Sequence, residues 1–99
     1  MPFKAPVSDF RFLFDHVVDY GQLADTGLFA DAGGDVTEQI LTEAGRLSAE
    51  VMAPLNRSGD LTPARLENGV VRTSPGFADA YRAIAEGGWI GLSATPEHG

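Results

Sequence analysis

The sequence predicts a mainly α-helical fold with one short β-hairpin near residues 64–73. Apolar residues recur at helical spacing in several segments. Asn68-Gly69 lies between two short β-prone stretches, a pair typical of tight hairpin turns. Glycine pairs and prolines bound these segments and mark where each element ends. A chain of 99 residues with no linker-like stretch forms at most one domain.

The first expected helix follows an extended N-terminus, with Ser8 or Asp9 as its cap and its end near Asp19. Its apolar residues fall at i, i+3, i+4 and i+7: Phe10, Leu13, Phe14 and Val17. The alternating phenylalanines at 10, 12 and 14 also fit a short strand. We favour the helix because Val17 and Val18 extend the apolar face beyond the length of a strand.

A glycine-rich stretch comes next, with one short helical turn expected around Leu23 to Phe29. The strongest helical pattern begins at Asp35, which lies three residues before Glu38, as in a capping box. Its apolar residues repeat at helical spacing: Val36, Ile40, Leu41, Ala44, Leu47, Val51 and Met52. Pro54 should limit this helix because proline has no amide hydrogen. Residues 55–63 are expected to form a loop.

A last helix is expected after the hairpin. Ser74 would cap it, and Pro75 would occupy its first position. Its predicted buried face consists of Phe77, Tyr81, Ile84 and Ala85. Gly87-Gly88 should end the helix, and no regular element is expected after it. Three apolar residues in that tail lack an obvious partner surface: Trp89, Ile90 and Leu92.

The composition excludes several classes of function. The formal charge is −7 and the seven basic residues are scattered, which argues against nucleic acid and anionic membranes as partners. The absence of cysteine excludes disulfides and thiolate metal sites. The first residues lack a signal-peptide pattern, and no apolar run is long enough to cross a membrane. A cytoplasmic location is therefore expected.

We find no motif for a catalytic, cofactor or metal site. The stretch from Asp31 resembles a calcium loop, but Val36 replaces the required glycine and Thr42 replaces the required glutamate. His16 and His98 lack metal-binding spacing. The serines have no partner pattern, the acidic pairs fit solvated helix faces, and neither a phosphate-binding loop nor a nucleophile elbow is present. The predicted catalytic, cofactor-binding and metal residues are therefore none.

Three blocks together resemble a known family. "MPFKAPVSDFRFLF", "VMAPLNRSGD" and "LENGVVRTSPGFADAYRAIAEGGWIGLSATPEHG" are similar to the N-terminal segment of FAD-dependent acyl-CoA dehydrogenases. The similar subgroup has an N-terminal extension and includes enzymes that act on 3-methylmercaptopropionyl-CoA. The resemblance covers essentially the whole chain. It implies that residues 1–34 are the extension, with one helix and a glycine-rich loop. Residues 35–99 would be the incomplete first part of the N-terminal helical domain.

The resemblance implies that the complete protein is an oxidoreductase that carries out α,β-dehydrogenation of an acyl-CoA thioester. It implies FAD, an electron-transfer flavoprotein as partner, and a homo-oligomer. No family motif for catalysis or flavin binding falls within residues 1–99, so the chain alone is expected to be inactive scaffold without cofactor. Because the chain stops inside a family motif at Gly99, we expect it to be a fragment.

Under this hypothesis, the surface of Trp89, Ile90 and Leu92 contacts the remainder of the chain or a second subunit. The alternative is a stand-alone acidic helical module that uses the same surface to bind a partner or itself, since an exposed apolar cluster marks such an interface equally well. Whether the chain by itself has enzymatic activity stays open at this point.

Overall fold

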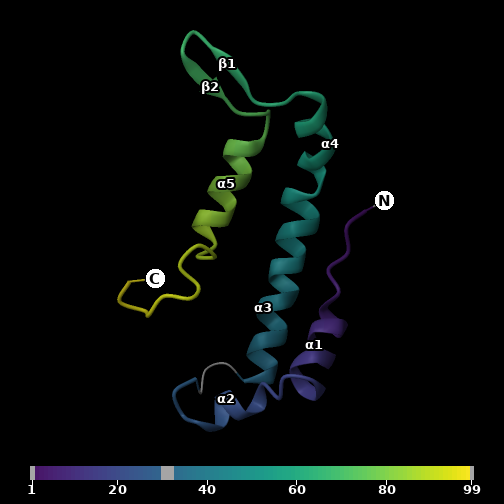
Figure 1. Cartoon of the computed structure of the whole chain (residues 1–99), viewed down its shortest axis with the longest axis vertical. Helices are drawn as coiled ribbons and strands as arrows, with labels where there is room; N and C mark the ends of the chain where they lie inside the picture. Colours follow the sequence, from purple (N-terminus) through teal and green to yellow (C-terminus); the bar gives the residue numbers. More distant parts are fainter. Residues whose placement is uncertain (1, 30–32, 99) are drawn as a thin grey trace. The chain divides into compact units, whose positions relative to one another are not determined.

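The computed structural model describes residues 2–29 and 33–98. This part of the chain is mainly helical and contains one two-stranded antiparallel sheet, which confirms the predicted fold class (Figure 1). The elements in chain order are α1 (Val7–His16), α2 (Gly21–Asp25), α3 (Gly34–Leu47), the π-helical η2 (Ser48–Met52), α4 (Pro54–Leu61), β1 (Arg65–Glu67), β2 (Val70–Arg72) and α5 (Phe77–Glu86). None of the helices in these ranges has the length and apolar character needed to cross a membrane.

The chain divides into two compact units, residues 1–49 and 50–99. The boundary falls within η2, in a segment where the sequence predicts a continuous α-helix ending at Met52. The predicted domain boundary at residue 34 rests on the family resemblance and not on compactness, and it stays a prediction. Each unit is described by itself below.

Helix α1 confirms the helical interpretation of the first segment over the strand alternative. It begins at Val7, directly after Pro6, whose carbonyl accepts the amides of Asp9 and Phe10. The expectation that Ser8 or Asp9 caps the helix is therefore wrong. The helix ends at His16, earlier than expected, because Asp19 adopts a left-handed conformation with φ of 51° that a helix cannot continue through.

The apolar face predicted for α1 stays largely exposed. Phe10, Leu13 and Val17 are 41%, 44% and 61% exposed. Only Phe14 is half-buried, and its ring stacks on Tyr20 with centroids 5.0 Å apart. The short turn predicted around Leu23 to Phe29 lies earlier in the chain, as α2, a five-residue helix over Gly21–Asp25.

Helix α3 begins without the predicted capping box. Its N-cap is Gly33, no side chain caps it, and Asp35 lies in its first turn. Glu38 does not fold back to a cap because its carboxylate is paired with Arg11 of α1. A reciprocal cap needs the Glu38 side chain to reach its own helix terminus, and this tertiary contact directs it elsewhere.

The largest error concerns the loop predicted for residues 55–63, because residues 55–61 belong to α4 and only Thr62 and Pro63 lie outside the helix. Pro54 occupies the first turn of α4 instead of limiting a preceding helix. Proline is tolerated there because the first-turn amides of a helix have no intrahelical acceptor. The residues that follow, including Gly59, therefore continue as helix up to Leu61.

The hairpin is confirmed. Leu66 pairs with Val71 in the antiparallel register, and Asn68 and Gly69 have φ of 53° and 79°. Two successive positive φ values define the type I′ turn, whose twist matches that of the flanking strands. In Figure 1 the hairpin connects α4 to α5.

Helix α5 begins two residues later than predicted. Its N-cap is Gly76, with a left-handed φ of 86°, and no side chain caps it. Ser74 instead lies buried before the helix, and its carbonyl accepts the amide of Phe77. The predicted end is confirmed, with Gly87 as C-cap and Gly88 at φ of 78°.

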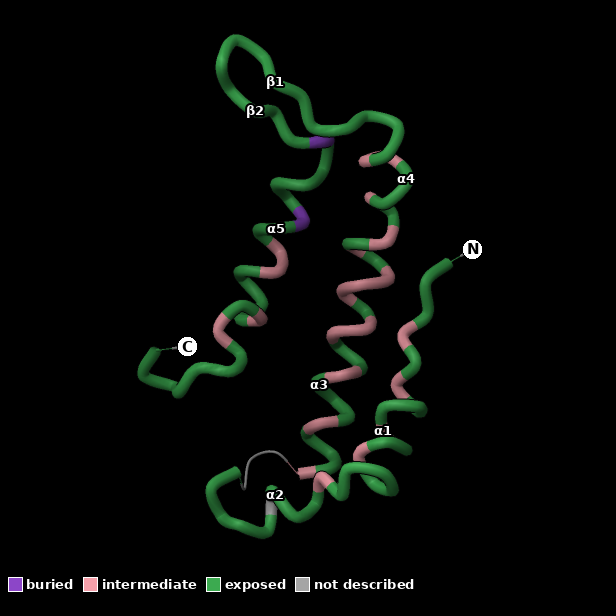
Figure 2. Tube along the Cα trace, in the orientation of Figure 1, coloured by how far each residue is buried: buried purple, intermediate pink, exposed green. Residues whose placement is uncertain are grey.

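Little of the described chain is buried. Ala80 and Ser74 are its only buried residues, and both lie in or just before α5 (Figure 2). The accessible surface is 7884 Å² for a mass of 10.5 kDa. Two separate compact units of half that mass would together expose only about 6,500 Å². The chain therefore exposes more surface than two self-sufficient domains of that size would.

Candidate functional site

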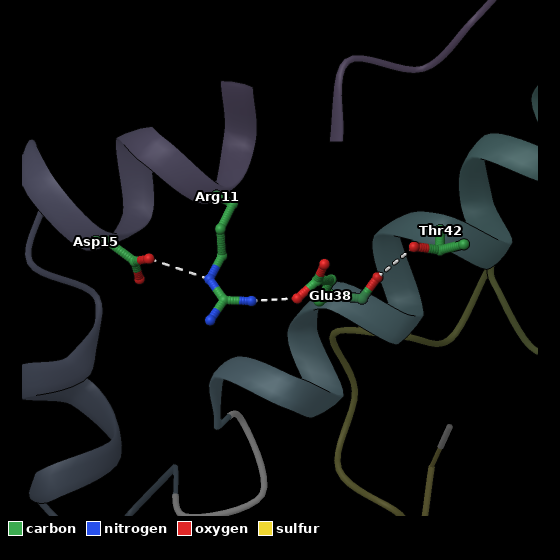
Figure 3. Close-up of polar contacts among 4 residues, drawn as sticks. All are labelled: Arg11, Asp15, Glu38 and Thr42. Carbon is green, nitrogen blue, oxygen red and sulfur yellow. Dashed lines mark hydrogen bonds and ion pairs between the residues drawn. The ribbon is translucent and has the colours of Figure 1, made fainter. Parts of the chain in front are cut away.

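Unit 1 contains one polar cluster that joins two helices. Arg11 of α1 pairs with Asp15 on its own helix, Nε to Oδ2, at 3.0 Å, and with Glu38 of α3 through Nη1 (Figure 3). The hydroxyl of Thr42 donates to the Glu38 carbonyl at 2.8 Å. Gly34 lies beside the guanidinium, where an added Cβ would be 3.5 Å from Nη2.

The electrostatics of this cluster favour a structural role. The hydrogen bond to Asp15 is the largest cause that raises the pKa of Arg11, and the charges of Asp15 and Glu38 act in the same direction. Arg11 therefore remains positively charged at any physiological pH, so it cannot serve as an acid or base. Its partners are about half exposed, and exposed ion pairs are weakened by salt.

The same side of α3 carries a shallow hollow of about 430 Å³. It is lined by polar and acidic residues of that helix: Asp35, Glu38, Gln39, Thr42 and Glu43. Its three carboxylates disfavour an anionic ligand. We therefore interpret this hollow as a row of solvated acidic side chains on one face of α3.

The histidines are not brought together with other ligands. His16 lies against Phe12 with ring centroids 5.1 Å apart, and the amide of His98 donates to the carbonyl of Thr95. Within residues 2–29 and 33–98, no three His, Cys, Asp or Glu side chains could hold a metal ion together. Asp31, the first residue of the calcium-like stretch, lies outside the described residues.

The serine hydroxyls do not form a nucleophile pattern. Ser48 donates to the carbonyl of Ala44 at 2.9 Å, and Ser58 donates to that of Leu55 at 3.2 Å. Each hydroxyl donates to a backbone carbonyl three or four residues earlier in the same helical segment. Such a local hydrogen bond involves no base that would activate the serine. That residues 1–99 carry no catalytic residue stays a prediction.

Unit 2 contains an apolar groove of about 370 Å³ between α4 and α5. One wall consists of Met52 from η2 with Leu55, Asn56 and Gly59 from α4. These four residues are spaced as i, i+3, i+4 and i+7, so they lie along one helical face. Asn56 supplies the only amide side chain among them.

The opposite wall repeats this spacing on α5, with Phe77, Ala80, Tyr81 and Ile84. A Cβ at Gly59 would lie 2.7 Å from Cζ of Phe77, so the glycine allows the ring to lie against α4. Ala80 is buried, whereas Phe77 and Tyr81 are 41% and 64% exposed. The predicted buried face of α5 is thus only partly buried, and three of its four residues line the groove.

The groove was not predicted from the sequence, because three residues of one wall, Leu55, Asn56 and Gly59, fall in the stretch expected to be a loop. The signal was present, since Leu55 and Gly59 continue the helical spacing of Met52 once Pro54 is taken as the start of a helix. The predicted surface of Trp89, Ile90 and Leu92 is distinct from the groove lining. Trp89 is half-buried, because its indole lies where a Cβ on Gly87 would be, whereas Ile90 and Leu92 are each 60% exposed.

The comparison with known proteins confirms the predicted resemblance to the N-terminal segment of an acyl-CoA dehydrogenase. The whole chain aligns, at 36% identity, with the N-terminal part of a 3-methylmercaptopropionyl-CoA dehydrogenase from Ruegeria pomeroyi. The 99 residues span only 17% of the length of that relative. No family model matches the chain.

Proposed function

We propose that this chain is the N-terminal segment of a flavin-dependent acyl-CoA dehydrogenase, whose complete form carries out α,β-dehydrogenation of an acyl-CoA thioester. The end-to-end alignment with the first part of a dehydrogenase carries the proposal. The thioester named for the relative, 3-methylmercaptopropionyl-CoA, is one candidate substrate among several.

In this proposal, residues 1–99 contribute scaffold and no chemistry. Arg11 is engaged in ion pairs, and the hydroxyls of Ser48 and Ser58 donate to carbonyls of the helical backbone. The described residues also bury too little apolar surface to form a self-sufficient domain. A segment with amphipathic helices and little core of its own is what an incomplete helical domain requires, because its apolar faces pack on elements elsewhere in the protein.

The complete enzyme in this proposal carries FAD, but the hollows described here do not fit that cofactor. The hollow on α3 presents carboxylates, which would repel the pyrophosphate of a dinucleotide. The groove of unit 2 has no charged lining residue; the Asn56 amide and the Tyr81 hydroxyl are neutral, so it lacks the cationic donors that bind a pyrophosphate strongly. The flavin would have to be held by other parts of the longer protein.

The proposal includes specific partners. The surface of Trp89, Ile90 and Leu92 would contact the remainder of the dehydrogenase chain or a second subunit, because Ile90 and Leu92 are largely exposed. The complete enzyme would be a cytoplasmic homo-oligomer that transfers electrons to an electron-transfer flavoprotein. The homo-oligomer and the electron-transfer flavoprotein are proposed from the family resemblance alone.

A stand-alone acidic helical interaction module is the second candidate. The exposed apolar residues of α1, with Phe12 and Val17 each about 60% exposed, would serve such a module equally well. The two candidates differ in the size of the natural polypeptide. They also differ in what the exposed faces contact, which would be the same polypeptide in the first case and a different one in the second.

An antibody raised against residues 1–99 would measure the size of the polypeptide in the cell that makes it. We expect a band about six times larger than 10.5 kDa, because 99 residues are 17% of the relative. The purified longer protein should show a flavin absorption spectrum that bleaches when an acyl-CoA is added. A band at 10.5 kDa would reject the dehydrogenase proposal in favour of the stand-alone module.

A further inference from the structure

The groove of unit 2 consists of two apolar faces that do not fill the space between them. Each wall presents four residues at i, i+3, i+4 and i+7 toward it, with Gly59 and Ala80 as the small members. Helices of this length depend on tertiary packing of such a face for their stability. Met52, Phe77 and Tyr81 nevertheless remain 46%, 41% and 64% exposed.

The shape and chemistry of the groove suit a third helix. A groove between two helices, with small residues among its lining, accepts the side-chain ridge of another helix at close distance. An eight-residue helix such as α4 is about 12 Å long, which matches an occupant of two to three turns. The lining contains no charged side chain, so the inserted face must be apolar.

Two other occupants fit less well. A second copy related by two-fold symmetry would place groove against groove and fill neither. Both copies would also carry a charge of −7. An acyl-CoA would need cationic donors for its phosphates, whereas no basic residue lines the groove and Arg82 on α5 is already paired with Asp79 at 3.1 Å.

We propose that the groove between α4 and α5 receives an apolar helix from the part of the same polypeptide that follows residue 99 in the longer protein. This inference rests on the proposed function, because the aligned relative has 83% of its length outside the matched part. It names a surface different from the contact surface expected from the sequence, which is Trp89, Ile90 and Leu92. The groove then becomes part of a core of three helices.

Cysteine labelling tests the proposal directly, because residues 1–99 contain no cysteine. Met52→Cys and Tyr81→Cys place a thiol at partly exposed groove positions, and Leu66→Cys places one on the hairpin, 74% exposed, to show that the reagent reacts. Each variant is prepared in the full-length natural polypeptide and labelled both in its folded state and after unfolding in urea. Maleimide addition at the named position is followed by peptide mass spectrometry.

We expect the groove thiols to react at least about tenfold more slowly in the folded full-length polypeptide than in urea, because the helix covers them, and the thiol of Leu66→Cys to be slowed much less. Equal rates in a full-length protein that binds flavin and oxidises acyl-CoA would overturn the groove proposal and leave the proposed function intact. If no longer polypeptide exists, or if it lacks flavin, the proposed function fails and the groove proposal fails with it.

The folded full-length polypeptide provides two further outcomes. Protection of the thiol in the Tyr81→Cys variant that increases with protein concentration would identify a second copy as the occupant. Protection of the same thiol by added octanoyl-CoA, at constant protein concentration, would identify a small apolar ligand. Either result overturns the proposal, whereas protection that depends neither on protein concentration nor on octanoyl-CoA agrees with it.

Discussion

The two units of the chain join their helices by different kinds of contact. In unit 1, an arginine of α1 reaches a carboxylate of α3. In unit 2, α4 and α5 meet through the ring of Phe77 against Gly59 and the side chain of Leu55 against Gly76. Residues 1–49 contain three basic and eight acidic side chains, which gives a net charge of −5. Residues 50–99 contain four basic and six acidic side chains, which gives a net charge of −2.

This difference indicates which unit should respond to which change. Ion pairs between exposed side chains are weak and are screened by salt. Close apolar contacts at glycine depend on shape and are lost when a methyl group is added. The contact between α4 and α5 should therefore be sensitive to small steric changes, and the contact between α1 and α3 to changes of charge and ionic strength.

The largest effect is expected for Gly76→Ala in unit 2. Gly76 has φ of 86°, and an added Cβ would lie 2.8 Å from Cδ2 of Leu55. A left-handed conformation costs a residue with a Cβ roughly 1–2 kcal/mol. Urea unfolding of unit 2, followed by the fluorescence of the single tryptophan, Trp89, should show a lower midpoint.

The matched control is Gly21→Ala in unit 1. Gly21 has an ordinary φ, and no atom lies within 4 Å of its added Cβ. Such a change reduces the freedom of the unfolded chain and should leave stability unchanged or raise it slightly. If Gly76→Ala and Gly21→Ala shifted the urea midpoint reported by Trp89 fluorescence equally, the steric explanation for unit 2 would be wrong.

The second effect concerns the N-terminal segment of unit 1. A Cβ on Gly45 would lie 2.7 Å from Cβ of Ala5, and a short alanine side chain cannot rotate away. Gly45→Ala should therefore displace the segment around Ala5 from α3. Limited trypsin digestion should cut several-fold faster after Lys4. Gly59→Ala, a comparable change in unit 2, should leave that cleavage rate unchanged, and an equal increase in both variants would contradict the prediction.

The difference between local and tertiary contacts explains which elements of the structure could be predicted from the sequence. The hairpin was predictable because Asn68-Gly69 encodes its own turn, independent of other elements. The end of α5 was equally local, since Gly88 supplies a left-handed residue. The family resemblance was also predictable, because it depends on the sequence alone.

The helix starts were not predictable because tertiary contacts compete with local capping. Glu38 had the spacing of a capping box but is paired with Arg11, a residue 27 positions away. Helix α4 was missed because Pro54 fits either the end of one helix or the start of another. The groove was then missed as well, since one of its walls belongs to α4.

A smaller effect is expected when the charged contact of unit 1 is removed. Arg11→Gln abolishes both ion pairs and should increase amide hydrogen exchange in α1, measured by NMR at low salt. The difference from the unmodified chain should disappear in 1 M NaCl, where the Debye length is only about 3 Å. Arg46→Gln is the control, because Arg46 pairs only with Glu43, within α3. A salt-independent difference would show that Arg11 acts through packing.

The smallest response is expected for alkaline pH. The pKa of Arg11 is raised, chiefly by its hydrogen bond to Asp15, above an ordinary value that already lies far above physiological pH. A raised pKa stabilises the folded form at every pH below the unfolded value, and the contribution is lost only as the pH rises through the folded value. The chemical shifts of α1 should therefore stay constant between pH 7 and 10. A transition in this range that persists in Arg11→Gln would place the titrating group elsewhere. A transition that Arg11→Gln removes would mean that the guanidinium contact depends on a group with a lower pKa.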